Sequence, residues 1–343
     1  MEAFGWIRKR KKIACSIRFF IAAAGFNRAN GRKRHHVVRP TKETLMDRRK
    51  FLSSSAGLGS ALVADSLLSV TASGTQTMNN SRKEFPIPSM QRGTGNTVSR
   101  KARVFVTGSA DGLGHATAET LLAQGHDVVV HVRSQARLSA VQKLVDQGAI
   151  ATIGDLSDLA QTRDLASQVN AIGAMDTVIH NAGILSGSPL LMVNVVAPYL
   201  LTTLIKRPKR LIYLSSSMHK SGRANLVDMD WSGRTSTGSY SDSKLFVTTL
   251  AASVARLWPE VLSNAVDPGW VPTKMGGPGA PDDLRLGHVT QEWLAVSDVP
   301  DALTSGGYWH HQRREQPHPA VSDIRFQDQL LTELARTTGT KLA

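Results

Sequence analysis

Tyr240 and Lys244 stand four positions apart in the second half of the chain. Residues i and i+4 of a helix share a face, so we expect the Lys244 ammonium beside the Tyr240 phenol. A phenol titrates near ~10, and a fixed positive neighbour favours the phenolate and lowers the pKa. Such a pair can donate or accept a proton on a substrate oxygen. Because Tyr-x-x-x-Lys also arises by chance, its meaning depends on the motifs around it.

A glycine cluster precedes this pair. The apolar, β-rich run at residues 104–107 leads directly into Gly108, Gly112 and Gly114, and a helical pattern follows. This order of strand, turn and helix predicts backbone amides and a helix N-terminus that face a pyrophosphate. The alternative is a tight turn without a ligand.

The next strand indicates which dinucleotide is bound. Val132 occupies the end of that strand, where an acidic residue would bind a ribose hydroxyl, and Arg133 follows it. Arginine suits a 2′-phosphate, so NADP is expected in preference to NAD. The alternative is that Arg133 only faces solvent from a loop.

Strands and helices alternate throughout the body of the chain. Such alternation predicts an α/β fold, a single doubly wound Rossmann-type domain over residues 102–343 with helices on both faces of a parallel sheet. No second domain or internal repeat is evident. The expected strands cover residues 104–107, 128–132, 149–153, 177–180, 211–214 and 263–266.

The basic charge of the chain is confined to its first part. Residues 1–101 hold 20 Lys and Arg against 5 acidic residues, a net +15, whereas the remainder has a net charge of −1. The body therefore lacks the basic stripe expected of a nucleic-acid-binding protein.

Residues 46–72 resemble a twin-arginine export signal. Arg48 and Arg49 precede a small-residue, apolar stretch that Asp65 interrupts, and residues 70–72 offer a cleavage site. This predicts a periplasmic protein, with a cytoplasmic one as the alternative. The stretch is too short and polar for a stable membrane span.

The rest of the leader is less specific. Residues 1–45 are a basic extension, either untranslated because the true start is Met46, or disordered and similar to a transit peptide. Residues 73–101 have the composition of a flexible linker. The only cysteine, Cys15, lies in the leader, so the body has no cysteine metal site, and we expect no metal.

Several motifs in this order resemble the short-chain dehydrogenase/reductase family. The resemblance implies an NADP(H)-dependent oxidoreductase that interconverts an alcohol and a carbonyl, with Tyr240 as general acid/base and Lys244 lowering its pKa. Ser216 would bind the substrate oxygen, with Ser217 as its rival, and Asn194 would hold a water that links Lys244 to solvent. The same resemblance assigns cofactor binding to Thr107, Gly108, Ser109, Asp111, Gly112, Leu113, Gly114, Arg133, Asp155, Leu156, Asn181, Ala182, Gly183, Tyr240, Lys244, Pro268, Gly269 and Thr273.

Loops give weaker indications. The long segment 218–239 is similar to that of retinol-dehydrogenase-like members and is a candidate substrate wall. Residues 276–281 are a candidate lid. Tyr308 and Trp309 either line the substrate pocket or pack in the core, and His180 is expected to be a packing residue. His310 and His311 are adjacent on an extended segment, so their side chains are expected to point apart and not to bind metal.

Two functions remain open from the sequence. One is an active oxidoreductase on a small alcohol or carbonyl substrate. The other is a non-catalytic, NADP-sensing or scaffold protein of the same fold, which predicts damage among Asn194, Ser216, Tyr240 and Lys244. None of the four is altered. Homo-oligomers are common in the family, although no helix of this chain identifies an interface.

Overall fold

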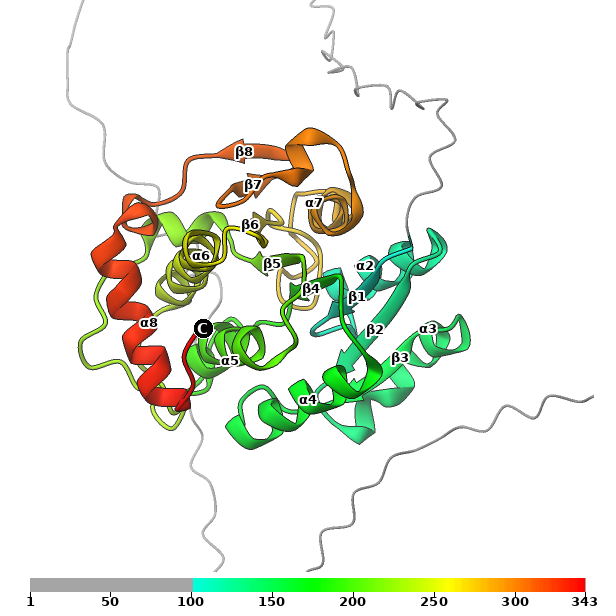
Figure 1. Ribbon diagram of the computed structural model, residues 1–343, viewed down its shortest axis with the longest axis horizontal. Coiled ribbons are helices and arrows are strands. Elements are labelled where there is room, and N and C mark those ends of the chain that lie inside the picture. The colour runs from blue at the N-terminus through cyan, green and yellow to red at the C-terminus, as the bar shows by residue number, and fades with distance from the viewer. Residues whose placement is uncertain (1–100, 343) are drawn as a thin grey trace, which may run out of the picture. The chain divides into compact units, whose positions relative to one another are not determined.

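An eight-stranded sheet forms the centre of the computed structural model, which describes residues 101–342 (Figure 1). The strand order is β3-β2-β1-β4-β5-β6-β7-β8. Strands β1 to β7 are parallel, and β8 runs antiparallel to β7. The strands are β1 (Arg103–Val106), β2 (Asp127–Val132), β3 (Ile150–Ile153), β4 (Thr177–His180), β5 (Arg210–Leu214), β6 (Leu262–Asp267), β7 (Tyr308–His310) and β8 (Arg313–Glu315).

The central strands are buried on both faces, which explains their continuous apolar sequences. In β1, Val104, Phe105 and Val106 are all fully buried. Val104 and Val106 belong to one hydrophobic cluster, whereas Phe105 belongs to the other, because successive side chains point to opposite faces. The sheet thus separates two cores.

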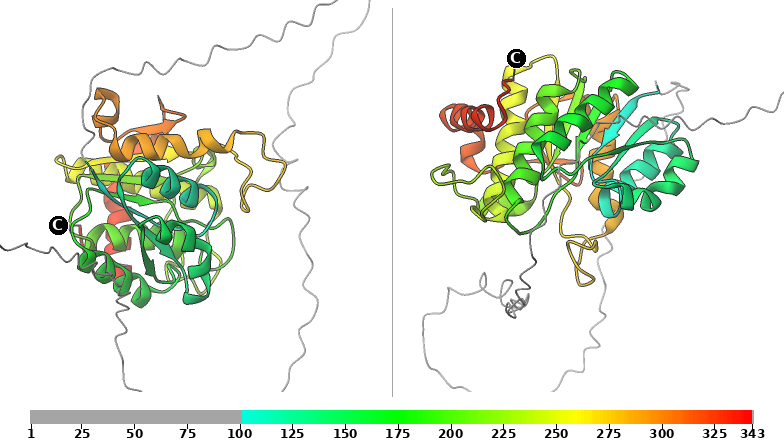
Figure 2. Two further views of the ribbon diagram at one scale, coloured as in Figure 1. Left: turned by 90° about the vertical axis from the view of Figure 1, so that its right-hand side faces the viewer. Right: turned by 90° about the horizontal axis from the view of Figure 1, so that it is seen from below.

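Helices cover both faces of the sheet. Helices α2 and α7 pack together on one face; α4, α5 and α6 cover the other, and α8 crosses α6 and packs against it (Figures 1 and 2). The α-helices are α2 (Gly112–Ala123), α3 (Gln142–Asp146), α4 (Leu159–Ile172), α5 (Ala197–Leu204), α6 (Tyr240–Leu257), α7 (Leu284–Val296) and α8 (Ile324–Thr338). Shorter 3₁₀ turns are η1 (Gln135–Val141), η3 (Ser217–Ser221), η4 (Pro300–Leu303) and η5 (Pro319–Ser322), and η2 (Met192–Val196) is a π-helical turn.

The chain changes direction across the sheet between β1 and β4. After β1 it forms β2 and β3 on one side, and then returns to form β4 and the remaining parallel strands on the other. Ligands of doubly wound sheets bind outside the carboxyl ends of the strands at such a switch point. The connections after β1, β4, β5 and β6 meet there, and the one between β6 and α7 projects from the body (Figure 2).

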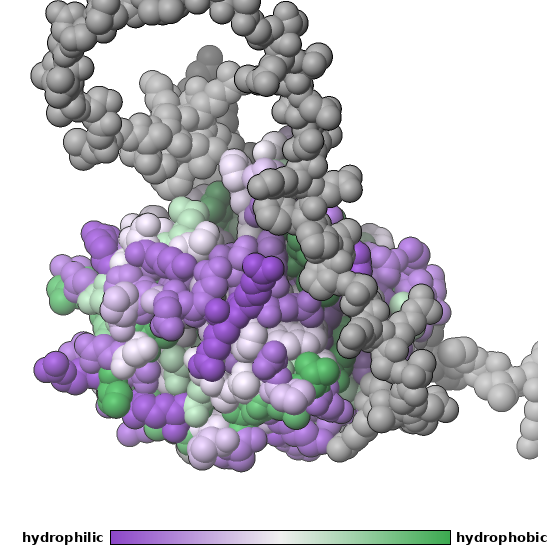
Figure 3. Space-filling view, turned by 90° about the horizontal axis from the view of Figure 1, so that it is seen from above, coloured by the Kyte–Doolittle hydropathy of each residue, from purple (hydrophilic) through white to green (hydrophobic). Residues whose placement is uncertain are grey.

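All six predicted strands are present, and the single Rossmann-type domain is confirmed. Strands β7 and β8 were not predicted, and β8 makes the sheet mixed rather than wholly parallel. The predicted export signal at residues 46–72, the extension before it and the linker up to residue 100 lie outside the described residues. Among residues 101–342, no helix combines the length and apolar character that crossing a membrane requires. One face of the molecule shows hydrophilic residues with scattered hydrophobic ones (Figure 3).

Candidate active site

Tyr240 is the first residue of α6, and a capping box fixes its position. The Ser239 hydroxyl accepts a 3.1 Å hydrogen bond from the Asp242 amide, and the Asp242 carboxylate accepts one of 2.8 Å from the Ser239 amide. The same carboxylate accepts hydrogen bonds from the backbone and guanidinium of Arg223. Burial acts to raise the pKa of Asp242, but these hydrogen bonds hold it below its usual value. The helix start is therefore tied to the loop that precedes it.

Lys244 lies one turn further along α6 and is buried, with 5% of its surface exposed. Its Nζ donates a 2.8 Å hydrogen bond to the carbonyl oxygen of Leu214 and lies 5.5 Å from the centre of the Tyr240 ring. The predicted proximity of the two side chains is confirmed. Burial lowers the pKa of Lys244 to about 8, opposed by the negative charge of Asp267.

The expected lowering of the Tyr240 pKa is not found. Burial, together with the charge of Asp267, raises the pKa of Tyr240 to about 12, while a hydrogen bond with the Ser216 side chain opposes this. The Lys244 ammonium, 5.5 Å from the ring centre, donates its hydrogen bond to the Leu214 carbonyl and does not reverse the direction of this shift. Tyr240 is thus protonated at neutral pH and suited to donate a proton.

The two candidate serines differ in position. Ser216 follows β5 and is half-buried, and its hydroxyl both contacts Tyr240 and accepts a 3.3 Å hydrogen bond from the Met218 amide. Ser217 is exposed. The arrangement brings Ser216, and not Ser217, to the phenol.

Asn194 lies in the π-helical turn η2, a conformation frequent at functional sites. Its amide nitrogen donates to the carbonyl of Ile184 at 2.9 Å and to the hydroxyl of Ser243 at 3.0 Å, while its oxygen accepts from the Ile184 amide at 2.9 Å. A Cβ on Gly183 would lie 3.4 Å from Asn194 Oδ1 and 3.5 Å from Lys244 Nζ. Asn194 is therefore close to Lys244, but only one lone pair of its side chain is left for a water.

The turn before α2 has the features of a phosphate-binding site. Gly108 and Gly112 have φ values of 69° and 57°, in the left-handed region that glycine favours. Asp111, the N-cap residue of α2, makes no capping hydrogen bond with its side chain. The first amides of the helix, from Gly112 to Gly114, thus lack a side-chain acceptor and fit a pyrophosphate at the helix N-terminus.

Residues from the connection after β4 support this turn. Asn181 donates a 2.9 Å hydrogen bond to the carbonyl of Thr107, and the Thr107 hydroxyl accepts one of 3.0 Å from the Ala182 amide. A Cβ on Gly114 would lie 2.3 Å from Asn181 Nδ2, so only glycine fits there. These contacts make Thr107, Asn181 and Ala182 structural supports of the glycine turn.

Ser109, which the resemblance assigns to cofactor binding, has its hydroxyl turned into the protein. It is fully buried, and its hydroxyl donates a 2.6 Å hydrogen bond to the carbonyl of Val106. Its amide donates to the carbonyl of His131. The polar atoms of Ser109 therefore hold the turn together from within.

His131 is a support that the sequence analysis missed. Its Nδ1 accepts a 3.0 Å hydrogen bond from the Gly108 amide, so Nε2 carries the proton and donates to the carbonyl of Gly154 at 2.7 Å. Burial lowers its pKa to about 4, which keeps the ring neutral at pH 7. A histidine in an otherwise apolar strand was the only signal in the sequence.

The predicted nucleoside contacts lie after β2 and β3. Arg133 is exposed and makes no ion pair with another of residues 101–342. Asp155 accepts hydrogen bonds from the amide and hydroxyl of Ser157 at 2.9 and 2.7 Å. Leu156 buries its side chain in the core beside α4. Of these, Arg133 keeps its side chain available to a ligand.

The connection from β6 to α7 reaches the glycine turn. Pro268 and Gly269 begin this connection, and Thr273 Cγ2 would lie 3.5 Å from a Cβ on Gly112. Asp111 accepts hydrogen bonds from Lys274 at 2.7 Å and Arg137 at 2.9 Å. A cavity of about 530 Å³ lies between these segments. It is lined by Ala110, Asp111, Gly112, His115, Ala116, Glu119, Ala140, Pro272, Thr273, Lys274 and Leu284.

Residues of β7 pack inside the protein. The Tyr308 hydroxyl donates a hydrogen bond to the Asp267 carboxylate. The Trp309 ring meets the Trp293 ring edge to face, and its indole nitrogen donates to Asn264. Both aromatic residues thus fit the packing alternative. The expectation that the His310 and His311 side chains point apart is wrong. Their rings stack with centroids 3.8 Å apart, because His311 has a φ of 46° and the strand ends there. No group of side chains in residues 101–342 is suited to hold a metal ion.

Two further predictions concern packing and the long loop. His180 is buried and stacks on Tyr213 with its Nε2 at 3.1 Å from the Thr202 hydroxyl, as expected of a packing residue. In the segment 218–239, Trp231 is buried and packs against Phe246 of α6. This contact anchors the long loop beside the helix that carries Tyr240.

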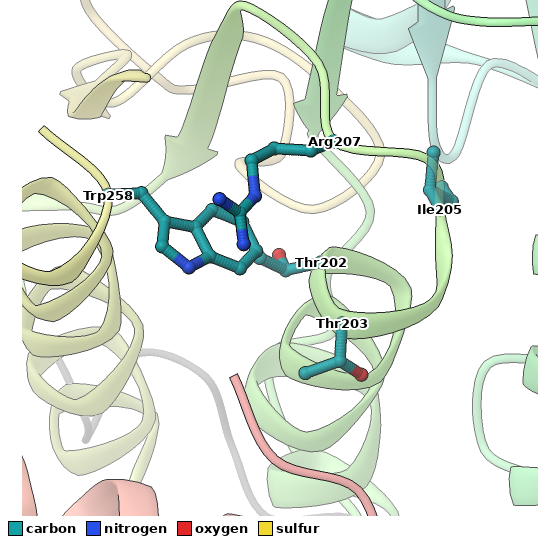
Figure 4. A pocket seen from close by; sticks show the side chains of 5 residues that line it. All are labelled: Thr202, Thr203, Ile205, Arg207 and Trp258. Carbon is teal, nitrogen blue, oxygen red and sulfur yellow. The ribbon is translucent and has the colours of Figure 1, made fainter. Parts of the chain in front are cut away.

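A second cavity, of about 170 Å³, is unrelated to this site. Figure 4 shows its lining residues, with the Arg207 guanidinium 4.1 Å above the Trp258 ring. Trp258 follows the last residue of α6, about 20 Å along the helix from Lys244. The cavity therefore lies toward the opposite end of the sheet.

Comparisons with known proteins agree with this geometry. The family model of short chain dehydrogenases matches residues 102–207. An uncharacterized oxidoreductase of Emericella nidulans is 37% identical over 252 residues, which cover 69% of this chain and 97% of that protein. A short-chain dehydrogenase of Gibberella zeae is 36% identical over 255 residues, 70% of this chain and 98% of that protein. A protein of Streptomyces sp. with the provisional name daunorubicin C-13 ketoreductase is 30% identical over 282 residues, 74% of this chain and 98% of that protein.

Solved structures share the fold. A protein of Mycobacterium paratuberculosis has a TM-score of 0.59 at 24% identity, covering 71% of this chain and 95% of that one. A blue fluorescent protein from a metagenomic library, solved with NADPH, has a TM-score of 0.52 at 24% identity, covering 61% and 95%. The chain belongs to the short-chain dehydrogenase family of oxidoreductases, whose members transfer hydride with a nicotinamide cofactor.

Proposed function

We propose that the protein reduces the carbonyl group of a small molecule with NADPH, and that Tyr240 donates the proton. The observation that carries this proposal is the half-buried Tyr240, whose hydroxyl contacts Ser216 and whose ring centre lies 5.5 Å from the Lys244 ammonium. When bound, the nicotinamide supplies the hydride that reaches the carbonyl carbon.

The side chains of the site bind the carbonyl oxygen, protonate it and stabilise the charge that remains. The hydroxyls of Ser216 and Tyr240 hold the carbonyl oxygen, and Tyr240 transfers its proton to that oxygen as negative charge develops there. Lys244 places a positive charge close to the phenolate that is left. Solvent then returns a proton to Tyr240. A water on this path can donate a hydrogen bond to the second lone pair of Asn194 Oδ1, which lies near Lys244.

NADP is preferred over NAD because Arg133 is exposed at the end of β2 and unpaired among the described residues. The NADPH complex of the metagenomic relative supports the same choice. For the substrate, the exposed side chains of Met218, Trp270 and Met275, in the loops after β5 and β6, favour an apolar or mixed molecule. The ketoreductase name of the Streptomyces relative points in the same direction.

The test is oxidation of NADPH and NADH by the full chain with a panel of aldehydes and ketones, beside Tyr240→Phe. We expect turnover with NADPH, and a loss of about 10²–10⁴-fold in Tyr240→Phe, with NADPH affinity retained. NADPH binding without turnover of any substrate would contradict the proposal and favour a sensing or scaffold protein. Equal turnover by both forms would remove Tyr240 from the chemistry.

A further inference from the structure

Asp267 is a buried carboxylate on the side of the sheet that faces the candidate active site. Successive side chains of β6 alternate between the two faces. Ala265 packs in the cluster that contains Leu245 and Phe246 of α6, whereas Val266 packs in the opposite cluster. Asp267, two positions after Ala265, therefore points toward α6, the helix that carries Tyr240 and Lys244.

Two hydrogen bonds hold this carboxylate in place. The Tyr308 hydroxyl donates to Oδ2 at 3.0 Å, and the Gly269 amide donates to Oδ1 at 3.0 Å. Only 3% of Asp267 is exposed. Both oxygens are thus fixed by neighbours from β7 and from the connection that follows β6.

A buried charge of this kind is unfavourable without a counter-charge. The Lys244 ammonium binds the carbonyl of Leu214, whose partner across the sheet is Val266, the residue before Asp267. The ammonium and the carboxylate therefore lie at the same end of neighbouring strands, on the same face. No salt bridge with a nitrogen–oxygen distance within 4.0 Å joins Lys244 and Asp267, so the two charges interact through the low-dielectric interior.

We propose that Asp267 is a positioning residue for proton transfer, whose carboxylate is the counter-charge that keeps the Lys244 ammonium and the Tyr240 hydroxyl protonated. This inference rests on the proposed function of Tyr240 and Lys244. The direction of the electrostatic effect supports it, since the charge of Asp267 raises the pKa of both side chains.

Other titratable groups also face Asp267. His310 Nδ1 lies 3.6 Å from Asp267 Oδ2. His219 packs on the Tyr308 ring; burial lowers its pKa, and its Nε2 accepts a hydrogen bond from the His318 amide. The full set consists of Tyr240 and Lys244 from α6, Tyr308 and His310 from β7, His219 from η3, and His311 beyond β7. Lys244 is the only amine in this set, and the negative charge of Asp267 raises its pKa.

The test measures the titration of Lys244 directly in the cofactor-free full chain. Lysine is labelled with ¹³C, the Lys244 Cε resonance is assigned by its loss in Lys244→Met, and its midpoint is followed with pH in wild type and Asp267→Asn. Removing the carboxylate should move this midpoint downward by about one pH unit. The matched control is Tyr308→Phe, which removes a hydrogen bond but keeps the charge, and its midpoint should stay near that of wild type.

An unchanged midpoint in Asp267→Asn, or an equal shift in Tyr308→Phe, would overturn the inference. If Asp267→Asn does not fold, the double variant with Lys244→Met decides: recovered folding supports the pairing of charges, and failure of both overturns it. Because the resonance is read without cofactor, it is independent of catalysis. Tyr240-dependent turnover combined with an unchanged midpoint refutes only this inference, whereas turnover that does not need Tyr240 refutes the proposed function.

Discussion

The Lys244 ammonium donates its hydrogen bond to the carbonyl oxygen of Leu214, at 2.8 Å, and so is held at the end of β5. This contact fixes the long side chain at 5.5 Å from the centre of the Tyr240 ring. Without it, the ammonium could turn away from the phenol toward solvent. The position of the positive charge is thus set by the sheet as well as by the helix.

Ser216 and Ser217 form a matched pair for mutation. We expect Ser216→Ala to lower turnover by about 10-fold or more, because one hydrogen bond to the developing oxyanion is lost. Ser217→Ala removes the same atom from an exposed neighbour and should leave turnover unchanged. Steady-state kinetics with NADPH compares the two. The reverse order of effects would assign the substrate contact to Ser217.

Reductase activity should decline as pH rises through about 8, the pKa of Lys244 in the folded protein. Below that pH the ammonium is charged and Tyr240, with a pKa of about 12, is protonated. Above it the lysine loses its charge while the phenol keeps its proton. A pH profile of kcat/KM measures this decline, the alkaline limb of the profile. Lys244→Arg, if active, should move the limb to higher pH because arginine stays charged. A limb that remains near 8 in that variant would point to another group.

Arg133 should determine the choice of cofactor. Loss of a charge-assisted hydrogen bond to a phosphate costs roughly 1.5–3 kcal/mol, so Arg133→Ala should weaken NADPH binding about 10- to 100-fold. NADH binding should change little, because NADH lacks the 2′-phosphate. Arg325→Ala, on the exposed side of α8, is the control. Equal losses for NADPH and NADH in Arg133→Ala would mean that the arginine does not distinguish them.

His131 should make the protein sensitive to acid. Its folded pKa of about 4 lies below the usual 6.5. Above pH 6.5 both folded and unfolded forms are neutral and its contribution to stability is fully present. As the pH falls toward 4, only the unfolded chain binds the proton, and stability is lost, by about 2 kcal/mol at pH 5.

Urea denaturation at pH 7.5 and pH 5 measures this loss. His180, whose pKa burial lowers to about 3, contributes a similar loss over the same interval. His131→Gln should therefore reduce the difference in unfolding free energy between the two pH values by about 2 kcal/mol, since glutamine can serve both Gly108 and Gly154 without titrating. His180→Gln is the matched control for a buried histidine outside the glycine turn. No change in the difference for His131→Gln would contradict the assigned tautomer.

We also propose that residues 46–72 direct export. A reporter fused to residues 46–78 should be exported, and replacing Arg48 and Arg49 with lysine should abolish its secretion, because the paired arginines are the receptor-read feature. Cell fractionation of the two fusions gives the answer. Secretion that persists in the lysine form would remove the export proposal.

The sequence predicted those parts of the fold that repeat a strong local pattern. The strands from β1 to β5 are mostly apolar runs next to glycine turns or helices, and the Tyr240–Lys244 pair follows from helical spacing. Strands β7 and β8 have three residues each, which is too short for a periodic signal. Their identity depends on pairing with β6, a contact between segments about 40 residues apart that a local pattern does not contain.

The electrostatics of the site were the part that local reasoning missed. The spacing of Tyr240 and Lys244 gave their proximity but not their burial, and burial decides the direction of both pKa shifts. Likewise, Asp267 and His131 gain their roles from neighbours distant in sequence, Tyr308 and Gly154. Such effects require the packed structure.

Strand β8 has a consequence for assembly. It is the outermost strand, three residues long, and its sequence Arg313–Glu315 is wholly charged. Short, charged edges are poor templates for pairing with a strand of another molecule. The sheet is thereby protected at this border from continuing into a neighbouring copy, and an ordered aggregate grown by edge-to-edge strand addition is disfavoured there.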